Sequence, residues 1–370
     1  MKLDINVLPP LFKNKNYFHP SVSQWTVGRQ VMTMQRISGS DFFGPVEWSF
    51  SEDNGKHWSV PSDIPSLGLN RLDDGRTEGV ADVRPFLHHP SKKIIAIGCN
   101  TYYTDCRCIT RDSLFRRDPQ FPVYAILSED GSWSKRHVLE GKCFEHFDNY
   151  RVACTQLIVL PDSDILIPIY LQENNTDERY SVCSIRCSFD GNSLKIKSYG
   201  NILTHTVKRG FIEPSLSFFE GTFYMTIRAE DDCGYYAESK DGVNWDDAKP
   251  WRWDSGKKLQ TSTTQQHWLN IQNSLYLVYT RKTSDNSDVM RWRAPLFISR
   301  FDQKNCTLVR KSEQTVFPLK YRNKQPNLLG NFHICALTNG ENVVSVGSWW
   351  QSEPLYTEVW QAKIKKPTEL

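Results

Sequence analysis

The chain has 370 residues, a formal net charge of +3 and an aromatic content of 12%, including 12 Trp. The charge is too small to indicate nucleic-acid binding, and no run of 18 apolar residues predicts a membrane span. The aromatic side chains suit the interiors of β-sheets and also stacking against sugar rings.

The first strand-like segments surround a tight-turn motif. Residues 1–16 are rich in Pro and Asn and form a predicted N-terminal arm. Strand-like runs at 22–25, 30–34 and 46–50 then lead into residues 51–58, which read S-E-D-N-G-K-H-W. Asp53 can accept local backbone N–H bonds and Gly55 can adopt positive φ, so we predict a tight hairpin turn closed by the apolar Trp58.

This motif, S-x-D-x-G-x-x-W, recurs along the chain in shortened forms. The copies begin at Ser51, Ser128, Ser188, Ser239 and Ser299, at intervals of 77, 60, 51 and 60 residues. A repeat of roughly 50–75 residues with one hairpin each is typical of propeller blades.

The rest of the chain continues as hairpins. Paired strand-like runs lie at 156–160 and 165–170, 215–219 and 222–228, 268–271 and 275–279, and 332–337 and 343–346. No segment shows a sustained helical period, and a long polar insertion occupies residues 100–118. We therefore predict an all-β, six-bladed propeller with four antiparallel strands per blade. It would form one domain, 1–370, in which the arm adds a strand to the last blade and closes the ring.

The ten cysteines are scattered, several of them within strand-like runs, which predicts buried free thiols. Cys106-Arg107-Cys108 is too closely spaced for a usual zinc pair. The N-terminus lacks the apolar segment of a signal peptide. We expect a cytoplasmic location, or secretion if a signal has been removed.

The repeated motif resembles the Asp-box of the sialidase superfamily, and the resemblance extends over nearly the whole chain. In that family the boxes lie on the outer rim of a six-bladed propeller, away from the central pocket. The resemblance therefore implies the fold and a turn-stabilising role for the motif. It also implies that the chemistry needs no metal, and we expect no cofactor. In any propeller the innermost strands converge on one pocket, where residues distant in sequence meet.

Glu213 and Arg228 are the first candidates for that pocket. Glu213 opens a strand and the hairpin returns to Arg228 fifteen residues later, so both charges lie at one edge of the blade. The pair resembles the sialidase element in which a Glu activates a Tyr nucleophile and an Arg binds the substrate carboxylate. The alternative is a structural salt bridge.

Asp41 is the second candidate, because it lies in a loop ten residues before Ser51. Its position resembles that of the acid/base Asp of sialidases. The neighbouring Phe42 and Phe43 could raise the pKa of its carboxyl group, as a general acid requires. The alternative is an ordinary loop residue.

Arg291-Trp292-Arg293 is the third candidate. On a strand, both Arg side chains would share one face, and a guanidinium group binds a carboxylate with two parallel hydrogen bonds. Its distance after Arg228 resembles that of the third carboxylate-binding Arg of the family. Arg281 is a competitor for this role, and a solvated strand face is the alternative.

Two departures separate this chain from the family pattern. Tyr17-Phe18-His19-Pro20 stands where an Arg-Ile-Pro is usual, and residues 329–333 lack the Tyr nucleophile. Tyr321, Asn331 and His333 are the possible substitutes for that Tyr. Polar residues at other strand openings complete the predicted pocket, namely His19, Asp82, Arg84, Gln156, Gln265, Gln266 and His267.

We predict an exo-acting glycoside hydrolase that removes a terminal, acidic sugar from a glycan. The predicted catalytic residues are Asp41, Glu213 and His333. The predicted substrate-binding residues are His19, Arg84, Gln156, Arg228, Gln266, His267, Arg281, Arg291 and Arg293. The alternatives are a propeller polysaccharide lyase acting on uronic acid, with a His or Tyr base, and a non-catalytic glycan-binding propeller. The expected partner is an oligosaccharide, with no nucleic acid or membrane, and the oligomeric state is open.

Overall fold

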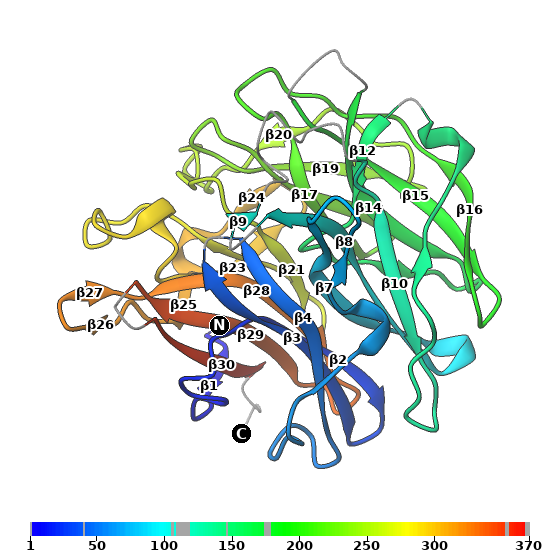
Figure 1. Ribbon diagram of the computed structural model, residues 1–370. Coiled ribbons are helices and arrows are strands. Elements are labelled where there is room, and N and C mark those ends of the chain that lie inside the picture. The colour runs from blue at the N-terminus through cyan, green and yellow to red at the C-terminus, as the bar shows by residue number, and fades with distance from the viewer. Residues whose placement is uncertain are drawn as a thin grey trace.

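Six antiparallel sheets follow one another around a ring in chain order, as the change of colour from blue to red in Figure 1 shows. The computed structural model describes residues 2–39, 41–104, 107–108, 119–145, 147–173, 179–351 and 355–366. Most of the 100–118 insertion, with Cys106, lies outside these residues. The predicted all-β, six-bladed propeller is confirmed.

The first three blades occupy the N-terminal half of the chain. Blade 1 contains β2 (Tyr17–Thr26), β3 (Arg29–Gly39), β4 (Phe42–Ser51) and β5 (Ser62–Asp63). Blade 2 contains β7 (Thr77–His88), β8 (Lys93–Thr104), β10 (Pro122–Leu127) and β11 (His137–Val138), with β6 (Asn70–Arg71) and β9 (Arg107–Cys108) at its ends. In blade 3, β12 (Phe147–Arg151) and β13 (Ile158–Val159) both pair with β14 (Ile165–Glu173), followed by β15 (Ser181–Phe189) and β16 (Leu194–Tyr199).

The last three blades follow the same plan. Blade 4 contains β17 (Ile212–Phe219), β18 (Thr222–Arg228), β19 (Tyr235–Ser239) and β20 (Lys249–Pro250). Blade 5 contains β21 (His267–Asn270), β22 (Leu275–Thr280) and β23 (Leu296–Asp302), and both β24 (Thr307–Leu308) and β25 (Gln314–Phe317) pair with β23. Blade 6 contains β28 (Leu328–Ala336), β29 (Asn342–Trp350), β30 (Tyr356–Lys365) and β1 (Asp4–Val7), and β26 (Tyr321–Arg322) and β27 (Gln325–Pro326) form a separate ribbon.

The helical content of the described residues consists of five short 3₁₀ turns, η1 (Pro65–Leu67), η2 (His89–Ser91), η3 (Lys142–Phe144), η4 (Met290–Trp292) and η5 (Arg310–Ser312). Among the described residues, no helix has the length and apolar character needed to cross a membrane. The eight cysteines whose side chains are described are all free thiols, and five of them are buried.

The N-terminal arm closes the ring. Strand β1 pairs antiparallel with β30, so that Asp4 lies opposite Lys365 and Val7 lies opposite Ala362. The two ends of the chain therefore meet in one sheet, and the blue and red segments lie side by side in Figure 1. The closure predicted for the arm is confirmed.

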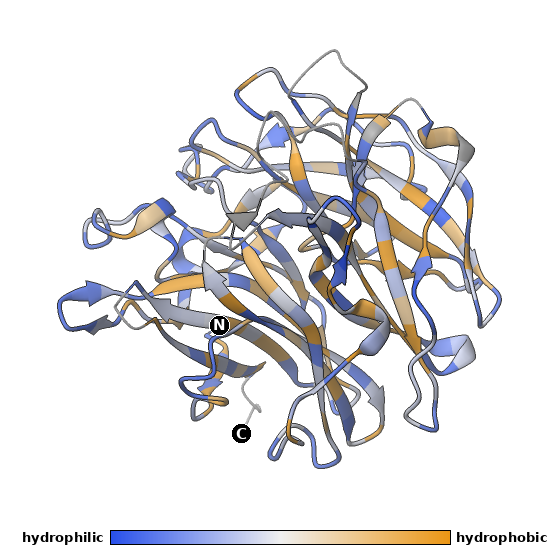
Figure 2. Ribbon diagram, in the orientation of Figure 1, coloured by the Kyte–Doolittle hydropathy of each residue, from blue (hydrophilic) through white to orange (hydrophobic). Residues whose placement is uncertain are grey.

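Apolar side chains fill the spaces between neighbouring sheets. Figure 2 shows orange positions along the strands and blue positions in many of the connecting loops. Ile298 of blade 5 and Val344 and Val346 of blade 6 are fully buried in one such layer. Each buried side chain of this size contributes about 1.5–3 kcal/mol relative to an exposed one, so these layers hold the blades in a fixed order around the axis.

The five copies of the repeated motif occupy equivalent places, at the end of the third strand of blades 1 to 5. We call them the outer turns, beginning at Ser51, Ser128, Ser188, Ser239 and Ser299. In the first, Asp53 Oδ1 accepts the N–H groups of Lys56 and His57 at 3.1 and 2.9 Å, and Gly55 has a φ of 77°. These are the contacts that the sequence predicts.

The tryptophan that follows an outer turn packs against the preceding blade. Trp245 of blade 4 is buried, and its Nε1 donates to Ser184 Oγ of blade 3 at 2.8 Å. Trp133 of blade 2 meets Trp48 of blade 1 edge to face. The motif therefore stabilises both a turn and a boundary between blades.

Candidate active site

The inner strands share an irregularity at the end of the ring opposite the outer turns. Strand β4 runs from the turn near Asp41 to the outer turn at Ser51, so these two turns lie at opposite ends of the blade. At the Asp41 end, the pairing registers of four inner strands, β2, β7, β17 and β28, are interrupted. Such bulges change the direction in which a side chain points.

Four chemically active residues adopt positive φ at this level, one in each of blades 1 to 4. The φ values are 51° for His19, 57° for Asp82, 52° for Cys154 and 48° for Glu213. A residue other than Gly rarely adopts this conformation, which costs about 1–3 kcal/mol and is concentrated at functional sites. Its recurrence in four blades indicates a functional constraint on this ring of residues.

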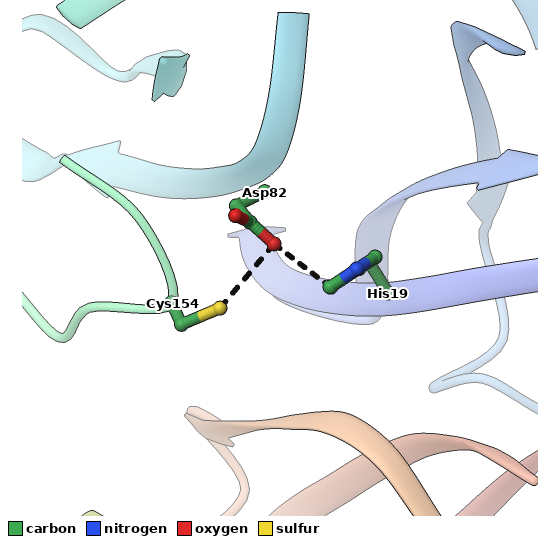
Figure 3. Close-up of side chains that lie close together, drawn as sticks. All are labelled: His19, Asp82 and Cys154. Atoms are coloured by element: carbon green, nitrogen blue, oxygen red, sulfur yellow. Dashed lines mark hydrogen bonds and ion pairs between the residues drawn. The ribbon is translucent and has the colours of Figure 1, made fainter. Parts of the chain in front are cut away.

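Asp82 lies at the centre of a cluster with His19, Cys154 and Asn331, which we call the central cluster. Its Oδ1 is 3.2 Å from His19 Nδ1 and accepts hydrogen bonds from Cys154 Sγ at 3.3 Å and Asn331 Nδ2 at 3.1 Å. Figure 3 shows His19, Asp82 and Cys154 directed toward one another from three segments of chain. His19 and Cys154 are buried, and the side chain of Asp82 is 16% exposed.

The predicted pair of Glu213 and Arg228 forms an ion pair, with Arg228 Nη1 donating to Glu213 Oε1 at 2.5 Å. Their side chains are only 13% and 5% exposed. Burial alone would raise the pKa of Glu213, but the charge and hydrogen bond of Arg228 lower it below its ordinary value. Glu213 Oε2 has no hydrogen-bond partner among the described residues. The carboxylate is therefore ionised and has one oxygen available.

Arg293 adds a second guanidinium group to this side of the ring. Its Nη1 lies 3.4 Å from both Leu329 O and Asn331 Oδ1, which are neutral acceptors. Burial and the nearby charges of Arg228 and Arg291 lower the pKa of Arg293 to about 10. The group remains charged at neutral pH, in surroundings that favour an additional anion.

The prediction that Arg291, Trp292 and Arg293 lie on a strand is wrong. Met290–Trp292 is the 3₁₀ turn η4, and Arg291 and Trp292 have positive φ values of 54° and 49°. An alternation over only three residues cannot distinguish a strand from a turn. The turn nevertheless leaves Arg293 beside Asn331.

His19 has aromatic and acidic neighbours. The rings of Phe18 and Phe43 lie 4.6 and 4.8 Å from its imidazole. Burial lowers the pKa of His19, and the charges of Asp82 and Asp41 oppose that shift. Asp41, in the turn between β3 and β4 with a φ of 58°, is thus within electrostatic range of the central cluster.

Three of the predicted residues form a deeper layer, below the central cluster. Arg84 donates to Thr155 O at 2.6 Å and to Ile334 O at 2.7 Å, which links blades 3 and 6 across the ring. Burial lowers the pKa values of His267 and His333 well below their ordinary value, so both rings are neutral. No described hydrogen bond joins His333 to the central cluster.

Three other predicted residues have structural contacts. Gln156 bonds the backbone N–H and carbonyl groups of Trp268, and it borders a 590 Å³ cavity at the opposite mouth of the ring. Gln266 Oε1 accepts from Thr226 and Trp251 between blades 4 and 5. Arg281 makes a two-point ion pair with Glu313. The structure does not bring these side chains to the central cluster.

Cys154 was not among the sequence candidates, and Asp82 was predicted to lie in the pocket but was given no catalytic or binding role. A comparison of the blades with one another could have found both. His19, Asp82, Cys154 and Glu213 each stand two residues before the polar positions Ser21, Arg84, Gln156 and Ser215 of their own blades. These residues are therefore identified by their shared position within the blade and not by a local sequence motif.

The fold is that of a sialidase-like six-bladed propeller. No protein-family model matches the chain, and no curated protein matches its sequence. Solved structures with similar folds are the Trypanosoma rangeli sialidase in complex with sialic acid and the K499G mutant of NanB sialidase from Streptococcus pneumoniae. The first has a TM-score of 0.62 at 15% identity over 94% of this chain and 54% of its own. The second has a TM-score of 0.66 at 12% identity over 98% of this chain and 70% of its own.

A protein of unknown function from Dyadobacter fermentans is similar over the full length. It has a TM-score of 0.64 at 16% identity and covers 99% of both chains. The present chain, by contrast, spans about half the length of the Trypanosoma sialidase. At these identities the comparison establishes the fold, and the chemistry has to be argued from the side chains.

Proposed function

We propose that the protein is an exo-acting glycoside hydrolase that removes a terminal acidic sugar. The observation that carries the proposal is the buried Glu213–Arg228 pair beside a second guanidinium group, that of Arg293. The sialidase folds, one of them in complex with sialic acid, are consistent with this substrate class.

The two guanidinium groups would bind the carboxylate of the sugar. Arg228 retains donors beyond its bond to Glu213, and the described partners of Arg293 are neutral oxygens. A substrate carboxylate would form charge-assisted hydrogen bonds there, which are about twice as strong as neutral ones. This arrangement favours an anionic sugar over a neutral one.

Two carboxyl groups near the bound sugar, those of Asp41 and Glu213, would divide the chemistry. Asp41, in the turn above His19, would protonate the departing oxygen as a general acid. Glu213, through its unpartnered Oε2, would accept a proton from the attacking water or stabilise positive charge on the ring. Asp82 lies deeper, and the described central cluster contains no Tyr, so the proposal does not include a covalent Tyr intermediate.

The test compares the wild-type protein with Glu213→Gln on chromogenic α-sialosides, glucuronides and neutral glycosides. We expect release from an acidic glycoside, reduced by at least about 10²-fold in the variant, the lower limit for general acid–base catalysis. Release only from neutral glycosides would contradict the acidic substrate. No release from any glycoside would contradict hydrolysis, and a new ultraviolet absorbance from a polyuronate would then favour a lyase. Binding without turnover would favour a glycan-binding protein.

A further inference from the structure

His19, Asp82 and Cys154 offer three metal-ligand atoms in one small volume. One donor atom from each residue lies within 4.8 Å of the other two. The residues come from β2 of blade 1, β7 of blade 2 and the segment between β12 and β13 of blade 3. They are 2%, 16% and 1% exposed, so water screens them poorly. A nitrogen, a carboxylate oxygen and a sulfur are the three donor types that zinc accepts in proteins.

The spacing of these atoms is close to that of a tetrahedral zinc site. Ordinary zinc–ligand bond lengths place the nitrogen and oxygen ligands about 3.4 Å apart, and the oxygen and sulfur ligands about 3.6 Å apart. The corresponding distances here are 3.2 Å for His19 Nδ1 to Asp82 Oδ1 and 3.3 Å for Cys154 Sγ to Asp82 Oδ1. These two separations lie within a few tenths of an ångström of the zinc values, and the third, between the ligand atoms of His19 and Cys154, is at most 4.8 Å.

The bonding of His19 supplies a second, independent observation. Its Nδ1 is buried and faces Asp82 Oδ1 at 3.2 Å, yet it has no hydrogen-bond partner among the described residues. A buried polar atom left in this state costs about 1–3 kcal/mol. A cation shared by the nitrogen and the carboxylate would remove that cost.

The amide of Asn331 lies beside two of the proposed ligand atoms, Asp82 Oδ1 and Cys154 Sγ. Its Nδ2 lies 3.1 Å from Asp82 Oδ1, 2.9 Å from Cys154 Sγ and 3.5 Å from His19 Nε2. A single electropositive group is therefore surrounded by electron-pair donors from three other blades. A metal ion bound by Asp82 Oδ1, Cys154 Sγ and His19 Nδ1 would replace the amide beside the oxygen and the sulfur, with the amide turned aside.

We propose that His19, Asp82 and Cys154 bind a single zinc ion at the centre of the propeller, with the fourth coordination position left to water or a substrate oxygen. Three protein ligands with one open position are typical of catalytic zinc sites. Cys154 binds as the thiolate and releases its proton on coordination. This site goes beyond the proposed glycosidase activity and does not depend on it.

Zinc titration of the chelator-treated full chain tests the site directly. Isothermal calorimetry should give one zinc ion per chain. Replacement by Co²⁺ should give a sulfur-to-metal charge-transfer band together with the visible absorption of tetrahedral Co²⁺. The absence of stoichiometric binding to the folded wild-type protein, or a cobalt spectrum without the sulfur band, would overturn the proposal.

Variants with a matched control assign the ligands. Cys154→Ser and His19→Ala should each weaken zinc binding by more than about 100-fold, because loss of a supporting residue alone costs 10–100-fold. Cys335→Ser, at a free cysteine of β28 without a place in the cluster, should bind zinc like the wild type. Equal binding by Cys154→Ser and Cys335→Ser would contradict the site.

A variant that should bind zinc more tightly tests the site even if the variants that remove a ligand fail to fold. Asn331→Asp places a carboxylate where an amide now competes with the ion, and it should tighten zinc binding by about tenfold or more, since added ligand charge tunes metal affinity. Weaker binding by this variant, if folded, would contradict the assigned position of the ion.

Discussion

The outer turns and the centre of the ring contain similar polar residues, but the two regions differ in whether the polar atoms have hydrogen-bond partners. At Ser239, the hydroxyl accepts the N–H of Gly242 at 2.9 Å and donates to Asp241 at 3.0 Å, all within four residues. In the central region, Glu213 Oε2, His19 Nδ1 and both nitrogens of His333 are buried without hydrogen-bond partners among the described residues. Polar groups satisfied by their own turn stabilise the fold, and groups left unsatisfied at the axis are available for a ligand.

The largest expected effect follows from breaking the buried ion pair at the axis. Arg228→Met leaves Glu213 as a buried charge without its partner, which should destabilise the protein by about 3–5 kcal/mol. Urea unfolding monitored by Trp fluorescence measures the change. The double variant Arg228→Met/Glu213→Gln should recover part of the loss, because the stranded charge is gone. A double variant as unstable as the single one would contradict the buried-charge explanation.

The next effect separates ligand binding from stability. Arg293→Met removes a donor for the substrate carboxylate, and a charged hydrogen bond of about 1.5–3 kcal/mol corresponds to a roughly 10- to 100-fold higher KM for an acidic glycoside. Initial-rate kinetics measure it, with Arg186→Met as the control, because Arg186 pairs with Asp162 and Asp164 away from the cluster. An equal rise in KM in both variants would argue against a carboxylate-binding role.

A smaller effect is expected in an outer turn. Ser239→Ala removes three local hydrogen bonds, two with Asp241 and one with Gly242, and should lower the free energy of unfolding by about 1 kcal/mol, while the kinetic constants stay unchanged. Ser255→Ala, at an exposed loop position, should change stability by less than about 0.5 kcal/mol. A loss of turnover in folded Ser239→Ala would contradict the conclusion that the outer turns serve stability alone.

The smallest effect concerns the acid dependence of the same turn. Burial opposes ionisation of Asp241, but hydrogen bonds from Asn244, Val243 and Ser239 lower its pKa from 3.8 to about 2. Because the folded-state pKa lies below the unfolded one, the stabilisation is present above about pH 4 and is lost as the pH falls toward 2. The stability difference between wild type and Asp241→Asn should shrink over that interval in urea unfolding at fixed ionic strength. A difference independent of pH would contradict this assignment.

The sequence by itself determined the parts of the protein in which neighbours along the chain interact. The outer turns depend on contacts such as that of Gly55 N with Ser51 Oγ, four residues apart, so a motif specifies them. The repetition of these turns predicted the blades and hence the ring. Glu213 and Arg228 also follow from the sequence, because one hairpin joins them.

The central cluster was decided only by the tertiary structure. Asn331 and Asp82 are 249 residues apart and meet because the ring closes. Gln156, Gln266 and Arg281 stand next to strand ends and were predicted to line the same pocket as Asp82, yet their blades provide them with structural partners. Which polar residue remains without such partners depends on the packing of one blade against the next, and a local sequence pattern contains no information about that packing.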